Sequence, residues 1–344
     1  MKNFKSVKEK TYAVEKAFFS PYASFSNKTK GRQRKEAPCE MRTEYQRDRD
    51  RLIYCKAFRR LKNKTQVFFS PEGDHYVTRL THTLDVAQIA RSIARARSLN
   101  EDLTEAIALG HDLGHTPFGH SGERILNKLS PDGFEHNVQS LRVVDVLEKD
   151  GRGLNLTFEV RDGIINHKKS GTPATLEGKC VSLADRIAYI NHDLDDAVRA
   201  GILNISDIPK DIVSVLGKTS KERINSAITS IYNRSVGKNT VEMDKQVEEA
   251  SERLRSFMFE RVYLTDSAKG EEEKAERMLS AMYSHFVSHP EELPQSYINL
   301  LEKYPREQTV CDYLSSMTDR YALYIFNSIF VPKGWTFIDE AGDK

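Results

Sequence analysis

Apolar residues recur along most of this chain with the spacing of an α-helix. After His82, apolar side chains follow at four, seven and eleven residues, as Val86, Ile89 and Ile93, and this spacing places them on one buried face. The same periodicity predicts helices at about 80–98, 101–113, 120–129, 136–149, 158–167 and 177–200, after a basic helical stretch at 44–63. Only residues 152–157 resemble a strand. The pattern therefore predicts an all-α fold, a helical bundle.

The periodicity also divides the chain into three stretches. Residues 1–40 show little pattern beyond a short helix at 7–19, and we expect an irregular arm that packs on the body or on a neighbouring subunit. Residues 41–205 form the predicted core. Its last predicted helix ends at about residue 200, where Gly201 is expected to form the helix C-cap. Residues 206–344 are expected to continue as helices, with a charged interruption at 266–274, in an extension packed on the core within the same domain.

Composition describes a globular protein, with 39% hydrophobic and 30% charged residues among 344. No apolar run approaches the ~18 residues that span a bilayer, and the N-terminus lacks the apolar core of a signal peptide. Four cysteines stand far apart without a C-x-x-C pair: Cys39, Cys55, Cys180 and Cys311. We therefore expect reduced thiols, a cytoplasmic location and no membrane partner.

Charge is unevenly distributed, although the net charge is only +2. Residues 28–64 carry fourteen Lys or Arg against five Asp or Glu, a local excess of nine. Such a stretch suits a polyanion, either a triphosphate or a nucleic acid. It suits equally well a solvated face that pairs with acids elsewhere in the chain.

The segment from His111 to Glu123 is unusually rich in side chains that can bind a metal or transfer a proton. It holds three histidines and two carboxylates, broken by three glycines and a proline. The preceding helical pattern predicts that His111 and Asp112 lie in the last turn of a helix that Gly114 ends. A neighbouring imidazole and carboxylate can reach one cation beside the helix, so this pair is a candidate half of a metal site.

Two further candidate ligands lie on other predicted helices. His82 is on a buried face, and Asp185 shares a stripe with Tyr189 and Asp193 at i, i+4 and i+8. Taken singly, His82 and Asp185 could be satisfied polar groups of a helical core. Two imidazoles and two carboxylates together suit a divalent ion, Mn²⁺ or Mg²⁺ or another transition metal such as Fe, Co, Ni or Zn. Such a site polarises a phosphoryl oxygen, which predicts metal-assisted hydrolysis of a phosphate ester.

Proton-handling groups follow the metal candidates. His120 and Glu123 are spaced i, i+3, so a helix beginning near His120 brings them into contact and lets the carboxylate set the imidazole tautomer. This arrangement suits a proton donor or an in-line nucleophile beside a phosphoryl group. His115 and His136 are candidates for the same pocket, and the sequence does not say which histidine acts on the leaving oxygen.

The order His82, His111-Asp112, Asp185 resembles that of the HD phosphohydrolase superfamily. The surrounding sequence is similar to that of its deoxynucleoside triphosphate triphosphohydrolase branch, the dGTPase-like proteins. The resemblance covers roughly residues 20–325 and rests on these runs: 46–53, 58–68, 73–82, 111–123, 184–196 and 312–322.

This resemblance implies an HD-domain fold, a homo-oligomer, and hydrolysis of dNTPs to deoxynucleoside and inorganic triphosphate. It implies that the metal is held by His82, His111, Asp112 and Asp185, and that the catalytic groups at the α-phosphate are His115, His120, Glu123 and His136. Arg79 is expected to bind phosphate oxygens. Gln66 and Asp193 are expected to bond the 3′-hydroxyl, while the Tyr189 ring crowds the 2′ carbon. The expected contacts to the outer phosphates are Arg59 and Lys168, with Arg60, Lys62 and Lys64.

One departure from the family pattern lies beside the first metal candidate. The family commonly has Arg-Thr-Arg where this chain has Val77-Thr78-Arg79, which bears on triphosphate affinity or on the binding of a nucleotide or single-stranded DNA effector. Two alternatives for the function stay open. One is another HD activity, a nucleotidase or phosphodiesterase. The other is a regulatory protein that binds a nucleotide or single-stranded DNA.

Overall fold

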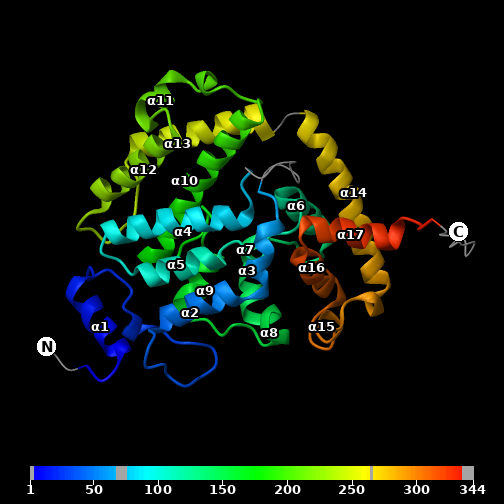
Figure 1. Cartoon of the computed structure of the whole chain (residues 1–344), viewed down its shortest axis with the longest axis horizontal. Helices are drawn as coiled ribbons and strands as arrows, with labels where there is room; N and C mark the ends of the chain where they lie inside the picture. The colour runs from blue at the N-terminus through cyan, green and yellow to red at the C-terminus, as the bar shows by residue number, and fades with distance from the viewer. Residues whose placement is uncertain (1–3, 67–75, 264–265, 335–344) are drawn as a thin grey trace, which may run out of the picture.

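The computed structural model describes residues 4–66, 76–263 and 266–334, which form helices joined by loops (Figure 1). Within these ranges there is no β-strand; residues pair only in two isolated bridges, Arg32 with Thr157 and Thr65 with Thr78. The predicted all-α fold is confirmed. The strand predicted at 152–157 is wrong, because Thr157 alone forms a bridge and the chain then enters a helix.

The centre of the fold is a layer of helices from the predicted core. Its members are α2 (Glu44–Tyr54), α4 (Arg79–Ala96), α5 (Glu101–Gly110), α9 (Phe158–Ile165) and α10 (Leu176–Arg199). Helix α4 packs on both α10 and α5, and α5 also packs on α2 and α9. Val86, Ile93, Leu103 and Ile107 are buried between these helices, as their spacing predicted. Side-chain oxygens of Thr78 and Asn100 cap α4 and α5.

Shorter elements connect and flank this layer. Before α4 these are α1 (Val7–Phe18), η1 (Ser26–Lys28), α3 (Lys56–Arg60) and η2 (Leu61–Asn63). After α5 come α6 (Gly119–Leu129), α7 (His136–Arg142), η3 (Val143–Leu147) and α8 (Glu148–Gly151). The single helix predicted at 136–149 is wrong in detail. The chain widens into a π-helical turn at η3 and then turns left-handed at Lys149 and Asp150.

The C-terminal third forms two separate groups of helices. The first comprises η4 (Ile205–Asp207), α11 (Lys210–Leu216), α12 (Ser220–Ser235), α13 (Lys245–Met258) and η5 (Phe259–Tyr263), and it packs on α10. The second comprises α14 (Asp266–Ser288), η6 (Pro290–Glu292), α15 (Gln295–Ile298), α16 (Arg306–Ser316) and α17 (Asp319–Phe330). Figure 1 shows these groups in yellow-green and in gold to red, on different sides of the molecule. Helix α14 packs on α6, which carries His120 and Glu123.

Two further expectations concern the ends of the core. The charged interruption predicted at 266–274 is wrong, because this stretch is the beginning of α14. The N-terminal stretch is tied to the core by buried polar contacts, since Ser24 donates to Glu177 and Arg32 pairs with Asp48. The domain boundaries at 40 and 205 stay a prediction. In the part of the chain that the structure describes, no helix has both the length and the apolar character to cross a membrane.

Candidate active site

The four predicted metal ligands converge from three helical segments. His82 lies in the first turns of α4, His111 and Asp112 directly follow α5, and Asp185 lies near the middle of α10. His82 Nε2 is 3.2 Å from Asp185 Oδ1 and 3.8 Å from Asp112 Oδ2. His111 Nε2 is 3.4 Å from Asp112 Oδ1 and 3.9 Å from Asp185 Oδ1. The packing of α4 against α5 and α10 therefore creates one cluster of nitrogen and oxygen donors.

The hydrogen bonding of His111 leaves one of its ring nitrogens open. Its Nδ1 lies 2.6 Å from the carbonyl oxygen of Ala108, so Nδ1 carries the proton and Nε2 presents a lone pair. That buried Nε2 has no hydrogen-bond partner among the described residues. A buried lone pair without a partner is costly. The set of His82, His111 and Asp112, whose donor atoms lie within 4.8 Å of one another, fits a cation.

Electrostatics favours the charged forms of both carboxylates. Burial opposes ionisation of Asp112, yet His111, His115 and Arg79 hold its pKa well below the usual value. Burial likewise opposes ionisation of Asp185, and a hydrogen bond from His82 outweighs it and lowers that pKa. Deprotonated carboxylates are the form that binds a cation.

Arg79 approaches the cluster from the first turn of α4. Its Nη1 donates to Asp112 Oδ2 at 2.9 Å, and its side chain is only 1% exposed. The Nε and Nη2 atoms are buried and have no hydrogen-bond partner among the described residues. A buried guanidinium with spare donors is suited to bind an anion next to the cluster.

A tight turn carries the chain from the cluster into α6. Phe118 adopts left-handed dihedral angles, φ 61° and ψ 27°, and Gly119 follows with φ 57°. A Cβ at Gly119 would lie 3.2 Å from the Gln66 carbonyl oxygen and 3.4 Å from Arg79 Nη2. Glycine thus permits close packing as well as the left-handed backbone. The turn directs α6 so that the His120 ring centroid lies 5.7 Å from that of His115 and Glu123 contacts His136.

The four predicted catalytic residues, three histidines and Glu123, contact one another in a connected group. His115 stacks on His136 with ring centroids 4.0 Å apart, and its Nε2 lies 3.1 Å from Asp112 Oδ1. His136 Nδ1 lies 2.8 Å from Glu123 Oε1, and His120 Nδ1 lies 3.4 Å from Glu123 Oε2. The predicted contact between His120 and Glu123 is therefore present, and the same carboxylate also binds His136.

A fourth ring, His167, completes this group and was missed from the sequence. Its Nδ1 donates to the Ile164 carbonyl at 2.7 Å, which leaves Nε2 as an acceptor 3.3 Å from His136 Nε2. His136 thus contacts Glu123 through Nδ1 and His167 through Nε2. The chain of contacts runs from buried His167 through His136 and Glu123 to exposed His120.

Burial and neighbouring groups shift the pKa values of these side chains. Burial, reinforced by the positive charge of Arg79, lowers the pKa of His115 well below its usual value. Burial also lowers the pKa of His167, to about 4. Burial opposes ionisation of Glu123, but hydrogen bonds from His120 and His136 outweigh it and hold the carboxyl pKa well below its usual value. At neutral pH the group therefore combines a neutral His115 with an ionised Glu123.

A second missed histidine lies behind His82. The His192 ring meets the His82 ring edge-on at 5.5 Å, and its Nε2 lies 3.4 Å from Asp85 Oδ2. Burial lowers the pKa of His192 to about 4. The available sequence signal was spacing, since His192 follows Asp185 by two helical turns and Asp85 follows His82 by one.

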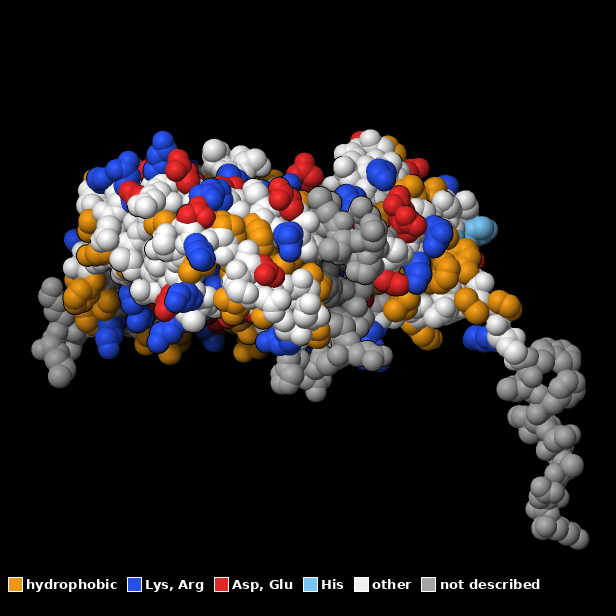
Figure 2. Space-filling view, turned by 90° about the horizontal axis from the view of Figure 1, so that it is seen from above, with side chains coloured by type: hydrophobic (Ala, Val, Ile, Leu, Met, Phe, Trp, Pro, Cys, Tyr) orange, Lys and Arg blue, Asp and Glu red, His pale blue; other side chains and the backbone are white. Residues whose placement is uncertain are grey.

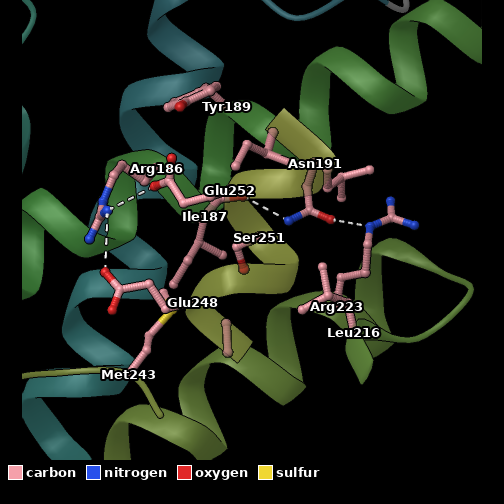
Figure 3. Close-up of a pocket in the computed structure, with 13 residues that line it drawn as sticks. Arg186, Ile187, Tyr189, Asn191, Leu216, Arg223, Met243, Glu248, Ser251 and Glu252 are labelled. Carbon is pink, nitrogen blue, oxygen red and sulfur yellow. Dashed lines mark hydrogen bonds and ion pairs between the residues drawn. The ribbon is translucent and has the colours of Figure 1, made fainter. Parts of the chain in front are cut away.

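The predicted sugar-binding residues flank the cluster. Tyr189 lies one turn beyond Asp185 on α10, where burial raises its pKa to about 12. It stands at the edge of a pocket between α10, α12 and α13, in which Arg186 pairs with Glu252 and Arg223 Nε donates to Asn191 (Figure 3). Asp193 is buried one turn further along α10, and Gln66 has a buried Oε1 without a partner among the described residues.

The predicted contacts to the outer phosphates are less uniform. Arg59 is exposed on α3, and Lys168 pairs with Glu135 at 2.7 Å, next to His136. Lys64 is buried instead, and its Nζ donates to the carbonyls of His115 and Ser315. Both bonds hold Lys64 in the protein interior, so its expected role in phosphate binding is replaced by a role in the fold.

Comparison with known protein families identifies two matched regions of the chain. Residues 79–190 match the HD domain, and residues 241–328 match the phosphohydrolase-associated domain. A deoxyguanosinetriphosphate triphosphohydrolase-like protein of Caldanaerobacter subterraneus is 55% identical over 329 residues, covering 96% of this chain and 97% of that protein. The chain belongs to this dGTPase-like family of HD-domain proteins.

A second curated relative supports the same assignment, and a solved structure shows the same fold. A Clostridium tetani protein with the same description is 47% identical over 339 residues, covering 95% of this chain and 97% of that protein. The crystal structure of a Bacteroides thetaiotaomicron phosphohydrolase shares the fold, with TM-score 0.51 and 19% identity over 81% of this chain and 68% of that one. The family model and the curated relatives identify the chain as an HD-domain hydrolase with a candidate metal site.

Several arginines of the basic stretch at 28–64 take part in ion pairs, but most of the paired acids belong to the same stretch and were already counted in its excess of nine. Arg32 pairs with Asp48, Arg49 with Asp102, and both Arg47 and Arg51 with Glu36. Figure 2 shows the molecule from above, the side of α11, α13 and α14, where Lys and Arg side chains are interspersed with Asp and Glu. Of the pairs named, only Arg49 with Asp102 offsets the excess, so both interpretations of the basic stretch stay predictions.

Proposed function

We propose that this protein hydrolyses deoxynucleoside triphosphates, dGTP or several dNTPs, to the deoxynucleoside and inorganic triphosphate. The observation that carries the proposal is the unpartnered Nε2 of His111, buried among His82, Asp112 and Asp185 and adjacent to a group of proton-handling histidines. The family assignment supports the substrate class, because the relatives are described as deoxyguanosinetriphosphate triphosphohydrolase-like.

His82, His111, Asp112 and Asp185 would hold a divalent cation. When bound there, the cation would polarise an α-phosphate oxygen as a Lewis acid and lower the pKa of a coordinated water. Mixed nitrogen and carboxylate donors suit Mn²⁺, Fe, Co, Ni or Zn, and Mg²⁺ when water completes the coordination. We propose Mn²⁺ and Mg²⁺ as the first ions to test.

The chain's own residues divide the remaining tasks. Arg79 binds phosphate oxygens through its spare Nε and Nη2 donors, which neutralises charge as water attacks the α-phosphorus and the bond to O5′ breaks. His115, neutral at pH 7, accepts a proton. His136, doubly hydrogen-bonded to Glu123 and His167, or His120, supplies the proton that the departing O5′ needs.

Selectivity for deoxyribose is assigned to residues on α10 and beside α4. Tyr189 would exclude a 2′-hydroxyl by occupying its space, while Gln66 and Asp193 would bond the 3′-hydroxyl. The position of Tyr189 one turn from Asp185 supports this role. Arg59 and Lys168 are the proposed contacts for the outer phosphates, since both lie at the surface.

The test is incubation of purified protein with each dNTP and with GTP, in the presence of Mn²⁺ or Mg²⁺, followed by ion-exchange separation of the products. The expected result is deoxynucleoside and triphosphate from at least one dNTP, with GTP unchanged. Orthophosphate or a monophosphate as product would support a nucleotidase or phosphodiesterase instead. Turnover only in nucleotide mixtures would indicate a nucleotide effector.

The second candidate function is a regulatory protein that binds a nucleotide or single-stranded DNA. It predicts steep weakening of DNA binding with salt and no turnover. The cluster of candidate metal ligands with its adjacent histidines favours the hydrolase over this second candidate. A homo-oligomeric assembly and a cytoplasmic location complete the proposal and are tested by light scattering and by cell fractionation.

A further inference from the structure

Residues 315–319, which run from the end of α16 to the first residue of α17, contact the turn that precedes α6. Asp319 is 1% exposed. Its Oδ1 accepts the backbone N–H of Phe118 at 3.1 Å. Its Oδ2 accepts both the backbone N–H of Thr65 at 3.1 Å and the Thr65 hydroxyl at 2.6 Å. One buried carboxylate thus joins the C-terminal helices to two segments beside the candidate site.

A buried lysine forms a second connection between the same segments. Lys64 Nζ donates to the carbonyl oxygen of His115 and, at 2.8 Å, to that of Ser315. The ammonium is enclosed, since Lys64 is 2% exposed. Lys64 and Asp319 therefore hold the two ends of the His115–Phe118 turn, one by a carbonyl and one by an N–H.

The turn needs such support because of its backbone conformation. Phe118 is left-handed at φ 61° and ψ 27°, a conformation that non-glycine residues rarely adopt. Its ring is buried with residues of α14 and α16 in a second hydrophobic cluster. Because α6 begins at the next residue, the Phe118 conformation sets the direction in which His120 and Glu123 leave the turn.

The helix that begins with His136 is held by the same end of α16. Gln139 Nε2 donates to Asp312 Oδ1 at 2.9 Å and to Ser315 Oγ at 3.1 Å. Arg142 Nε donates to Asp312 Oδ1 at 2.7 Å, and its Nη2 donates to Oδ2 at 2.7 Å. The C-terminal helices therefore contact both segments that carry proton-handling residues, α6 and α7.

We propose that the 315–319 segment of the phosphohydrolase-associated region sets the relative geometry of the catalytic histidines, with Asp319 as the positioning residue. The inference rests on the proposed function for its catalytic readout. Asp319 does not itself reach the metal ligands; it acts through Phe118 and Thr65 on the turn between His115 and His120. The associated region is then part of the active site's support, while metal binding depends on α4, α5 and α10.

The test compares Asp319→Asn with wild type and with Asp48→Asn in the full-length protein. Asp48 is a matched control, because it too is buried and accepts the N–H and hydroxyl of one threonine, Thr157, at 2.8 and 2.7 Å, but away from the turn. With dGTP and Mn²⁺, Asp319→Asn should lower kcat by about 10- to 100-fold, the loss expected when catalytic groups are misplaced by about 1 Å. Its KM and bound Mn²⁺ should match wild type.

Hydrogen–deuterium exchange provides a readout that needs no turnover. Peptides covering 112–124 should exchange faster in Asp319→Asn than in wild type, while peptides of α4 and α10 stay unchanged. Asp48→Asn should leave both kcat and the exchange of 112–124 at wild-type values, even where its melting temperature falls.

Three results would overturn the inference. One is unchanged exchange of 112–124 in Asp319→Asn. Another is a wild-type kcat in that variant. The third is a parallel loss of kcat, metal and melting temperature in both aspartate variants, which indicates general destabilisation. Absence of dNTP turnover in wild type would instead refute the proposed function, and the exchange comparison would still decide whether Asp319 fixes the turn.

Discussion

Glu123 binds His136 twice, accepting its backbone N–H at 2.9 Å and its Nδ1 proton at 2.8 Å through the same Oε1. This paired contact fixes both the start of α7 and the orientation of the His136 ring. The second carboxylate oxygen remains for His120, at 3.4 Å. Glu123 therefore connects two histidines and lies outside the four predicted metal ligands.

This separation predicts different losses for His111→Ala and Glu123→Gln. His111→Ala should abolish both metal binding and turnover, because its open Nε2 lies among the metal donors. Glu123→Gln should retain the metal and lower kcat by about 10²- to 10⁴-fold, the usual contribution of acid–base groups. Metal content by mass spectrometry and dGTP turnover measure the two effects. Equal loss of metal in both variants would contradict the division of roles.

Glu123 should also make stability depend on pH in the metal-free protein. Its folded-state pKa lies below the ordinary 4.5, so its stabilisation is fully present above about pH 4.5 and is lost as pH falls toward the lower folded value. Glu123→Gln should lower the free energy of unfolding at pH 7 by about 1–3 kcal/mol, the contribution of buried hydrogen bonds to a charge. Below pH 4.5 the free energies of unfolding of Glu123→Gln and of wild type should become more similar.

Urea denaturation with EDTA from pH 3 to 7 checks this dependence. Glu273→Gln is the control, because Glu273 is exposed on α14. It should unfold like wild type throughout. If Glu123→Gln lowers the free energy of unfolding by the same amount at every pH, the carboxylate charge is not the cause of the loss.

The spare donors of Arg79 predict a defect in phosphate binding. Arg79→Lys keeps the charge but loses the planar array of donors, so the KM for dGTP should rise by about 10-fold or more. Arg91→Lys on the same helix is the control, because Arg91 pairs at the surface with Glu101. Steady-state kinetics with Mn²⁺ at fixed pH compares the two. An unchanged KM in Arg79→Lys would indicate that Arg79 binds Asp112 and does not contact the phosphates of dGTP.

The sequence was sufficient to predict the central helices and the site built from them. His82, Asp185 and the His111-Asp112 pair lie on helices whose apolar periodicity is strong, so their inward direction followed from spacing. The contact of His120 with Glu123 followed from i, i+3 spacing. The structure brings all these residues together, while their roles as ligands and catalysts stay predictions.

The features that were missed depend on contacts between distant segments. Lys64 meets Ser315 across 251 residues, and Phe118 meets Asp319 across 201, so no local pattern distinguishes these residues from surface charges. His167 shows the same difficulty, because its role depends on the Ile164 carbonyl and the position of α7. The left-handed turn at Lys149 and Asp150 also lies within a sequence that reads as continuous helix.

Gly114 offers a final test of how tightly the site is packed. A Cβ at this position would lie 2.2 Å from Ser140 N and 2.5 Å from the His136 carbonyl oxygen. Backbone atoms of α7 cannot move aside without shifting His136. Gly114→Ala should therefore destabilise the fold by about 3 kcal/mol or more and reduce activity in the fraction that folds.

Gly270→Ala is the matched control on α14. A Cβ there meets nothing within 4 Å, so alanine should stabilise the helix by about 0.5–1 kcal/mol. Urea denaturation monitored by circular dichroism measures both free energies. If Gly114→Ala unfolds at the same urea concentration as wild type, then α7 can move away from the turn after His111, and the close contact between α7 and this turn is not required for the fold.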